Sequence, residues 1–233
     1  MKTIGLIGGM SWESTLSYYR AINEGIKSKL GGLHSAKIIL YSVDFGEIEE
    51  LMKENDWNQI AVQLTEAAKK IESSGADFLM ICTNTIHKIA PVLEEKIEIP
   101  LLHIADATAE KIKEKGYDKV GLLGTAPTME MDFYKGRLLT KHKIDTVIPD
   151  KKDREIIHKV IFDELCLGKI EKASRKKYIE IIEDLAAKGA KAVILGCTEI
   201  AMLVSQEDTK IPLLDTTQIH ADMAVSKAIE AIS

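Results

Sequence analysis

Short apolar runs alternate along the chain with longer stretches in which apolar residues recur at helical spacing. Four apolar residues of one such stretch lie on a single helix face: Leu64, Ala67, Ala68 and Ile71. Gly75 follows them as a C-terminal stop. The short runs predict strands at Thr3–Gly8, Ala36–Val43, Phe78–Ile81, Leu101–Ile104, Val120–Leu123, Thr146–Ile148 and Ala192–Leu195. The longer stretches predict helices at Glu13–Leu30, Trp57–Ser74, Thr85–Lys96, Ala105–Lys115, Met129–Lys141, Asp153–Leu167, Lys172–Lys188, Glu199–Val204 and Thr217–Ala231. Because apolar strands alternate with helices, we predict βαβ units and parallel sheets covered on both faces.

The chain also contains an internal repeat. Three segments recur in the same order: Ile4–Gly8 as Val120–Gly124, Gly75–Thr83 as Gly189–Thr198, and Ile99–Leu102 as Ile211–Leu214. The offset is nearly constant, since Gly5 to Gly121 spans 116 positions and Cys82 to Cys197 spans 115. The repeat predicts two similar Rossmann-like or flavodoxin-like α/β domains with parallel-sheet cores, related by pseudo-twofold symmetry.

The repeat also predicts where the domains divide. We expect the first domain at residues 1–102 plus 215–233, the second at residues 103–214, and the functional site in the cleft between them. The last predicted helix follows the second Ile-Pro-Leu-Leu segment and is expected to pack back on the first domain.

Composition and charge exclude several classes of partner. The chain is 45% hydrophobic and 29% charged, which is typical of a globular protein with a substantial core. Its formal net charge of −5 offers no basic surface for nucleic acid, and no apolar run approaches the roughly 20 residues that cross a membrane. The N-terminus leads straight into a strand-like segment without an apolar leader, so we expect a cytoplasmic protein.

The three cysteines do not form a pattern typical of disulfides or metal sites. An odd number argues against a disulfide framework, and no Cys-x-x-Cys occurs. Cys82 and His87 lie five positions apart, but no second pair completes a set of metal ligands. We therefore expect reduced thiols and no metal.

Two of the cysteines occupy equivalent places in the repeat. Cys82 and Cys197 each follow a predicted buried strand directly, and each precedes a Thr and a predicted helix. Ligands bind beyond the carboxyl ends of strands in open α/β sheets, and a helix N-terminus there favours a thiolate. Most free cysteines are packing residues, but this matched placement favours a catalytic pair that faces across the cleft.

A pair of thiols on opposite sides of a substrate suits racemisation next to a carboxylate. One group must remove a proton from Cα and the other must return a proton on the opposite face. A thiolate and a thiol can exchange these roles, and no pyridoxal-binding lysine motif is present. The residues therefore predict a cofactor-independent amino-acid racemase.

Polar residues beside the two cysteines are expected to bind the substrate. Asn84 and Thr85 follow Cys82, whereas Thr198 and Glu199 follow Cys197, and these groups at two helix starts suit an α-carboxylate. In each half, a glycine turn ends the first strand, at Gly8–Ser11 and at Gly124–Thr128. Such turns let the backbone approach a small ligand. The site residues that we assign are Met10, Ser11, Thr83, Asn84, Thr85, Thr125, Thr198 and Glu199. The alternative of a dinucleotide site is disfavoured, because Gly5–Gly9 does not complete G-x-G-x-x-G.

Three motifs resemble those of the aspartate/glutamate racemases, and the resemblance covers essentially the whole chain. The motifs are Gly8-Gly9-Met10-Ser11-Trp12-Glu13-Ser14-Thr15, Cys82-Thr83-Asn84-Thr85-Ile86-His87 and Gly196-Cys197-Thr198-Glu199. The chain looks most similar to the bacterial aspartate or broad-specificity amino-acid racemases. The resemblance implies Cys82 and Cys197 as the base and acid, with Ser11, Asn84, Thr85, Thr125 and Thr198 lining the site. It also implies a homodimer and no cofactor.

Two departures from this family bear on the substrate. Glutamate racemases carry Asp-Ser in the first turn and Cys-Thr-His in the second half. This chain has Met10-Ser11 and Cys197-Thr198-Glu199 at those places, so the resemblance disfavours a strict glutamate racemase. The basic residues that bind a distal carboxylate in some aspartate racemases are missing at the matching places. Arg20, Lys135 or Arg137 would have to replace them, so an acidic or a neutral amino acid remains open as substrate.

Other readings stay open at this point. A maleate isomerase-type enzyme also uses two cysteines, an arylmalonate decarboxylase-type enzyme uses one, and a non-catalytic protein could bind an amino acid without turnover. We interpret Cys166 as a packing residue and His87 as structural. Trp12, Tyr18 and Tyr19 are interpreted as helix-packing or cleft-wall residues, and the acidic run Glu47–Glu54 as a solvated helix face. Glu199 is expected to orient Cys197 and to raise the pKa of its thiol.

Overall fold

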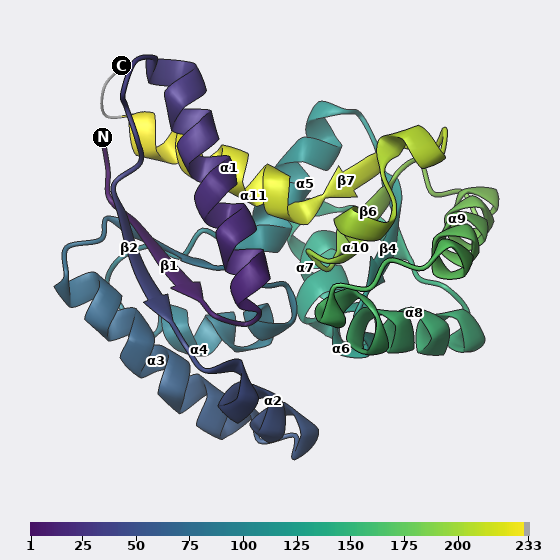
Figure 1. Ribbon diagram of the computed structural model, residues 1–233, viewed down its shortest axis with the longest axis horizontal. Helices are drawn as coiled ribbons and strands as arrows, with labels where there is room; N and C mark the ends of the chain where they lie inside the picture. Colours follow the sequence, from purple (N-terminus) through teal and green to yellow (C-terminus); the bar gives the residue numbers. More distant parts are fainter. Residues whose placement is uncertain (231–233) are drawn as a thin grey trace. The chain divides into compact units, whose positions relative to one another are not determined.

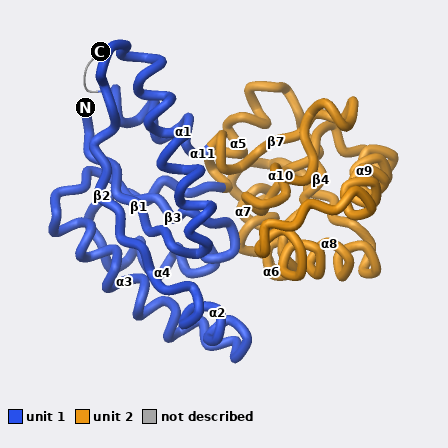
Figure 2. Tube along the Cα trace, viewed as in Figure 1, with its two compact units in different colours: residues 1–104, 220–233 blue, residues 105–219 orange. Residues whose placement is uncertain are grey.

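The computed structural model describes residues 1–230, which form two compact units (Figure 2). The first unit comprises residues 1–104 and 220–233, of which 231–233 lie outside the described residues, and the second comprises residues 105–219. Each unit has its own parallel sheet. Two parallel-sheet α/β cores are therefore present, as the repeat predicts.

The first unit is built on a three-stranded sheet of order β2-β1-β3 (Figure 1). Its strands are β1 (Ile4–Gly8), β2 (Ile38–Ser42) and β3 (Phe78–Ile81), and β1 pairs in parallel with both neighbours. Every residue of β1 and β3 is buried. The sheet therefore has an apolar layer on each face, as expected for a parallel sheet.

Alternation along β3 assigns its side chains to two different layers. Leu79 and Ile81 belong to one apolar cluster, together with helix α3 (Trp57–Ser73). Phe78, Met80 and Cys82 belong to the other, together with helices α1 (Trp12–Leu30) and α11 (Thr216–Ile229). The period of two residues along the strand thus directs Cys82 toward the α1 and α11 side.

A glycine lets α1 and the C-terminal helix approach closely. A Cβ atom on Gly25 of α1 would lie 2.7 Å from Cγ2 of Val225 on α11. Ala221, Ala224 and Ala228 of α11 are buried in the same layer. The part of α11 from residue 220 onward therefore packs on the first sheet (Figure 1).

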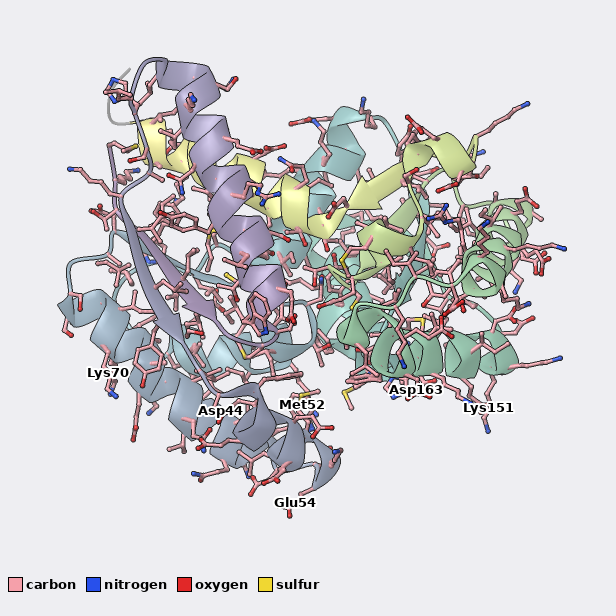
Figure 3. All side chains as sticks on the ribbon, in the orientation of Figure 1. Asp44, Met52, Glu54, Lys70, Lys151 and Asp163 are labelled. Carbon is pink, nitrogen blue, oxygen red and sulfur yellow. The ribbon has the colours of Figure 1, made fainter. Side chains whose placement is uncertain are left out.

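The remaining helices of the first unit are short. Helix α2 (Phe45–Lys53) begins after Asp44, whose Oδ1 accepts a hydrogen bond from the Gly46 N–H, and ends before Glu54; Asp44 and Glu54 are labelled in Figure 3. Glu47 and Glu50 of α2 are exposed whereas Ile48 is buried. The acidic run is therefore a solvated helix face, as predicted. A 3₁₀ helix η1 (Thr85–Ile89) leads into α4 (Ala90–Glu94).

The second unit is built on a four-stranded parallel sheet of order β5-β4-β6-β7. Its strands are β4 (Lys119–Gly124), β5 (Asp145–Val147), β6 (Val193–Gly196) and β7 (Leu213–Asp215). Its helical segments are α5 (Ile104–Glu114), α6 (Ala126–Glu130), α7 (Asp132–His142), α8 (Lys151–Asp163), η2 (Leu165–Leu167), α9 (Lys172–Ala187), α10 (Ile200–Leu203) and η3 (Gln206–Asp208). Strand β6 is buried throughout and pairs with both β4 and β7.

Several predicted elements differ from the observed ones. Leu101–Ile104 is not a strand, because only Leu101 forms a parallel bridge with Leu79 before α5 begins at Ile104. Strand β7 was not predicted. The predicted helix Thr85–Lys96 is divided into η1 and α4, with Pro91 in the first turn of α4.

The predicted helix Met129–Lys141 is likewise two helices, because the backbone of Met131 is extended. The predicted helix Asp153–Leu167 ends as α8 at Asp163, and η2 follows. The end of the predicted helix Thr217–Ala231 lies outside the described residues. Among residues 1–230, none of the helices combines the length and the apolar character that a membrane span needs.

Candidate active site

The first glycine turn requires its glycine and caps the following helix. Gly9 has φ of 93°, and a Cβ atom there would lie 2.6 Å from the Val43 nitrogen. The Gly9 N–H donates to Thr15 Oγ1 at 2.8 Å, and Ser11 Oγ accepts a hydrogen bond from the Ser14 N–H at 3.4 Å. Ser11 is therefore the N-cap of α1. The Met10 side chain is buried in the apolar cluster on the α3 side of the sheet.

The backbone of Cys82 is held on both sides. Its N–H donates to the Ile7 carbonyl at 2.9 Å, and its carbonyl accepts a hydrogen bond from Ser14 Oγ at 3.2 Å. The residue is 1% exposed and belongs to the apolar layer with α1 and α11. Burial therefore raises the pKa of the Cys82 thiol far above its ordinary value.

The segment after Cys82 does not form the predicted helix N-terminus. Thr83 is partly exposed, and Asn84 and Thr85 are buried at the start of a 3₁₀ helix of five residues. The expectation that a helix dipole lowers the pKa of this thiol is wrong, because the segment is too short to supply one and burial dominates.

His87 links this segment to the start of α5 (Ile104–Glu114). Its Nδ1 lies 2.7 Å from the Thr83 carbonyl oxygen, and its Nε2 accepts a hydrogen bond from the Ile104 N–H at 3.2 Å. Because Nε2 is the acceptor, we infer that Nδ1 carries the proton and donates to Thr83. These contacts support a structural role for His87.

Two further histidines of the first unit surround His87. The His87 ring centroid lies 4.5 Å from that of His103 and 5.9 Å from that of His220. His220 Nε2 lies 2.8 Å from the Leu102 carbonyl, and its Nδ1 lies 3.0 Å from Tyr18 Oη. Burial lowers the pKa of His220 to about 4, so this ring is neutral at neutral pH. The sequence motifs do not indicate this cluster, because its members are far apart along the chain.

In the second unit, Thr125 follows β4 and lies at the start of α6. It is buried, and its Oγ1 lies 3.1 Å from Thr128 Oγ1. The next residue, Ala126, donates its N–H to Nδ1 of His158 at 3.2 Å. Burial lowers the pKa of His158, although Glu130 and Asp163 oppose this. No sequence motif pointed to His158.

Cys197 follows β6 and contacts a carboxylate. Its Sγ lies 3.0 Å from Glu199 Oε2, and Thr198 Oγ1 donates to the same oxygen at 2.6 Å. The Cys197 residue is only partly buried, but lost solvation at its sulfur raises the pKa of the thiol, and Glu199 raises it further. These contacts support the expectation that Glu199 orients Cys197 and raises the pKa of its thiol. The following helix, α10, has only four residues.

Cys166 lies in the same unit as Cys197. It is partly buried in η2, and its electrostatic interaction with Cys197 contributes to the raised pKa of that thiol. The predicted long helix around Cys166 is absent, since η2 has three residues.

The carboxyl end of β7 adds a residue that sequence reasoning missed. Leu195 of β6 pairs with Asp215 of β7, so Thr217 follows the edge of the sheet where Cys197 also lies. The Thr217 N–H donates to Asp215 Oδ1 at 2.9 Å, whereas its buried Oγ1 has no hydrogen-bond partner within residues 1–230. The repeated Ile-Pro-Leu-Leu segment could have indicated this strand end.

Arg137, one of the basic residues considered for a distal carboxylate, is engaged within the second unit. Its Nε and Nη2 lie 2.7 Å from the two oxygens of Asp106, and Lys141 Nζ and His142 Nε2 contact the same carboxylate at 2.6 and 2.8 Å. Burial alone would raise the pKa of Asp106, but these hydrogen bonds hold it well below its usual range. Lys135 Nζ lies 3.8 Å from Asp132 Oδ1.

The aromatic residues of α1 divide into two kinds. Tyr18 is fully buried, as expected of a packing residue. Trp12 and Tyr19 are 61% and 51% exposed, so neither is a helix-packing residue, and the alternative that they line a cleft wall stays a prediction. Both lie at the edge of the buried face of α1, since at about 100° per residue each is within roughly 40° of Ile26 around the helix axis. In the described part of the chain, no three His, Cys, Asp or Glu side chains are grouped as a metal site.

Fold and site together define a two-unit α/β protein in which one buried strand of each unit ends in a Cys-Thr pair. The family model described as Asp/Glu/hydantoin racemase matches residues 7–224. The chain therefore belongs to the Asp/Glu/hydantoin racemase family.

Known relatives agree with this assignment. A Yersinia pestis protein of solved crystal structure, provisionally described as an Asp/Glu racemase, is 53% identical, with 99% of this chain and 100% of that chain covered and a TM-score of 0.94. An aspartate racemase homologue from Pyrococcus horikoshii OT3 is 33% identical, with 99% and 100% covered and a TM-score of 0.87. The broad-specificity amino-acid racemase RacX of Bacillus subtilis strain 168 is 21% identical over 233 residues, which is 96% of each chain. The chain is thus an enzyme of an amino-acid racemase family, and racemases are isomerases.

Proposed function

We propose that this enzyme is a cofactor-independent amino-acid racemase in which Cys82 and Cys197 act on opposite faces of the substrate Cα. The observation that carries the proposal is the matched placement of the two thiols. Each is the first residue after a buried parallel strand, β3 in one unit and β6 in the other, and each is followed by Thr. Ligands of α/β sheets bind at such strand ends.

The reaction needs one thiolate and one thiol at a time. In one direction the Cys82 thiolate accepts the Cα proton, and the Cys197 thiol donates its own proton to the opposite face of the planar carbanion. The cysteines end with their protonation states exchanged, and proton exchange with solvent after product release restores them for the next turnover. Because Glu199 accepts the Cys197 S–H at 3.0 Å, it favours the thiol form of Cys197, so we assign Cys82 as the first base.

The raised pKa values suit this chemistry. A buried thiol is a strong base once it is ionised, and the proton on Cα of an amino acid is only weakly acidic. The positive α-ammonium group of a bound substrate would offset part of the cost of forming the thiolate. Turnover is therefore expected to increase as the pH rises above neutrality.

The substrate is a small amino acid. Hydroxyl, amide and backbone groups beside the two strand ends would bind its carboxylate and ammonium groups: Met10, Ser11, Thr83, Asn84, Thr85, Thr125, Thr198 and Glu199. Aspartate and glutamate are the first candidates, followed by neutral amino acids. Because Arg137 is already paired with Asp106, the site has one fewer cation for an acidic side chain, which favours broad specificity. We further propose a cytoplasmic homodimer without nucleic-acid or membrane partners.

Incubation with a panel of L-amino acids in D₂O tests the proposal. A racemase incorporates solvent deuterium at Cα and produces the D-enantiomer. Cys82→Ser and Cys197→Ser should each abolish racemisation while substrate still raises the Tm, and Cys166→Ser is the matched control that keeps activity. Full activity in Cys82→Ser would refute the two-thiol mechanism.

The same panel separates the alternatives. Turnover of maleate without exchange at Cα of any amino acid would indicate a maleate isomerase-type enzyme. Stabilisation by an amino acid without exchange would indicate a binding protein.

A further inference from the structure

Two of the three cysteines of this chain are partly exposed, and both lie in the second unit. These are Cys166, in η2, and Cys197, which directly follows β6. Cys82 lies in the first unit and is only 1% exposed, so a reagent dissolved in water does not reach its sulfur. Oxidants react with thiols that are accessible, and a second thiol nearby can then complete a disulfide. Cys166 and Cys197 are therefore the pair to consider for oxidation.

The segments that carry these two thiols contact each other. Helix η2 packs against α10, which begins at Ile200, three residues after Cys197. The Ile200 N–H donates to the Cys197 carbonyl at 3.1 Å, so the backbone of Cys197 is tied to the start of the helix that η2 contacts. The two sulfur atoms are also close enough to interact electrostatically, since Cys166 is among the groups that raise the pKa of Cys197. Cys166 thus lies near the thiol to which the proposed mechanism gives the role of acid.

Helix η2 can move toward α10 without disturbing the sheet. It is a single 3₁₀ turn of three residues and pairs with none of the strands within residues 1–230. The N–H groups of Leu167 and Lys169 both donate to the Glu164 carbonyl at 3.0 Å, which are local hydrogen bonds that move with the turn. Residues 167–170 are exposed. A disulfide needs Cβ atoms about 3.5–4.5 Å apart, and a shift of this one turn would provide that approach.

We propose that Cys166 and Cys197 form a reversible disulfide when the enzyme meets a hydroperoxide, and that this bond switches off racemisation by occupying the acid thiol. The site is thus a redox modification site within the second unit. Only the loss of activity rests on the proposed function, because formation of the bond requires the two thiols and the oxidant alone. Transient disulfides of this kind act as redox sensors in reducing compartments.

The oxidation consumes two thiols and one hydroperoxide. Glu199 accepts the Cys197 S–H at 3.0 Å and favours its thiol form, so we assign Cys166 as the first to react. Its sulfur attacks one peroxide oxygen, so that an S–O bond forms, the O–O bond breaks, and the released hydroxide leaves as water with the thiol proton. The Cys197 sulfur then attacks the Cys166 sulfenic acid, and Glu199 receives the Cys197 proton. The S–S bond forms, the S–O bond breaks, and the second hydroxide leaves as water with that proton. The two thiols lose two electrons, which the peroxide gains.

Peptide mass spectrometry of the full chain tests the proposal. The protein is treated with hydrogen peroxide, its remaining thiols are blocked with iodoacetamide in denaturant, and it is cleaved with trypsin without reduction. Trypsin places Cys166 in the peptide 160–169, Cys197 in 192–210 and Cys82 in 71–88. We expect a cross-linked pair of 160–169 with 192–210, lower in mass by two hydrogens than the sum of both peptides. Racemase activity should fall at least about tenfold as the cross-link forms, and dithiothreitol should reverse both changes.

Cys166→Ser is the decisive variant, because it keeps both proposed catalytic thiols. At the same dose of peroxide it should form no cross-link and retain its activity, with circular dichroism to verify folding. Cys82→Ser should form the cross-link to the same extent as the parent chain, and Cys197→Ser should form none.

Four results would each overturn the proposal: a cross-link that contains the peptide 71–88, a disulfide between two chains, oxidised Cys197 without the cross-link, or an equal loss of activity in Cys166→Ser. The cross-link is detected by mass and without substrate. A chain that forms it but racemises no amino acid would therefore refute the proposed function and still establish the disulfide.

Discussion

Replacement of Glu199 by Gln should lower the pKa of the Cys197 thiol. The Glu199 Oε2 atom lies 3.0 Å from Cys197 Sγ, and its negative charge opposes ionisation of the thiol. At an effective dielectric constant of about 20, two like charges about 4 Å apart repel by about 4 kcal/mol, which corresponds to about three pKa units. The amide of Gln keeps the size of the side chain but removes this repulsion.

Alkylation by iodoacetamide reports the change, because only the thiolate reacts. A fall of about three pKa units raises the thiolate fraction about 1,000-fold at neutral pH, but the less basic thiolate is also a weaker nucleophile. With a Brønsted coefficient of about 0.4–0.5, the net gain in the alkylation rate of Cys197 is roughly 40-fold. Peptide mass spectrometry after timed quenching measures the rate at each cysteine separately.

The control is Glu207→Gln, which removes an exposed carboxylate of the same unit and should leave the Cys197 rate unchanged. Cys82 serves as an internal reference, since it lies in the other unit. An unchanged or slower reaction of Cys197 in Glu199→Gln would refute the electrostatic reasoning. A parallel acceleration at Cys82 would instead indicate that the substitution loosens the fold.

Three further predictions concern stability. Asp106→Asn should lower the free energy of unfolding by about 2–3 kcal/mol at neutral pH in urea titrations, because Arg137, Lys141 and His142 lose the carboxylate that they share. Since the folded state depresses the pKa of Asp106, this difference from the unaltered chain should disappear as the pH falls below about 4. Folding also depresses the pKa of His220, to about 4. The unaltered chain should therefore keep its full stability above about pH 6.5 and lose up to about 3 kcal/mol as the pH falls toward 4, whereas His220→Gln should lack this part of the slope. Gly25→Ala should lower the Tm and cost about 1–3 kcal/mol, because the added methyl group would lie 2.7 Å from Cγ2 of Val225 and this outweighs the gain in helix propensity.

A specific result would contradict each of these three stability predictions. Asp106→Asn would contradict the reasoning if it were no less stable than Asp132→Asn, which removes an exposed carboxylate. His34→Gln, at an exposed position, should keep the acid slope of the unaltered chain, and an equal slope in His220→Gln would exclude His220 as its source. A higher Tm in Gly25→Ala would show that α11 moves away at little cost.

The strands that carry the candidate site could be predicted from local sequence. Phe78–Ile81 was predicted with the bounds that the structure has, and the β6 prediction differs by one residue at each end. Parallel strands are buried on both faces, so each reads as a short apolar run, and the residue after the run must lie at the carboxyl end of the strand. The position of both cysteines relative to the sheets was therefore contained in the sequence.

The length of the helices was less predictable where the backbone bends. The helix expected after Cys82 is divided at Pro91, and the helix expected after Met129 is divided by the extended backbone of Met131. Apolar periodicity continues across the first break because Ile86, Ile89 and Leu93 belong to one apolar cluster, and buried apolar residues continue across the second. Periodicity alone therefore could not reveal the interruptions.

By itself, the sequence determined the duplicated α/β pattern, the strand ends that hold Cys82 and Cys197, and the family to which the chain belongs. Only the tertiary structure decided the pKa of those thiols. Burial raises the pKa of both, and the short segments that follow them supply no helix dipole to lower it. The tertiary structure also decided that Arg137 pairs with Asp106, a residue 31 positions away, and that Trp12 and Tyr19 face outward. The physical reason is the same in each case. Strand placement follows from local apolar pattern, whereas solvation and charge pairing depend on residues that only folding brings together.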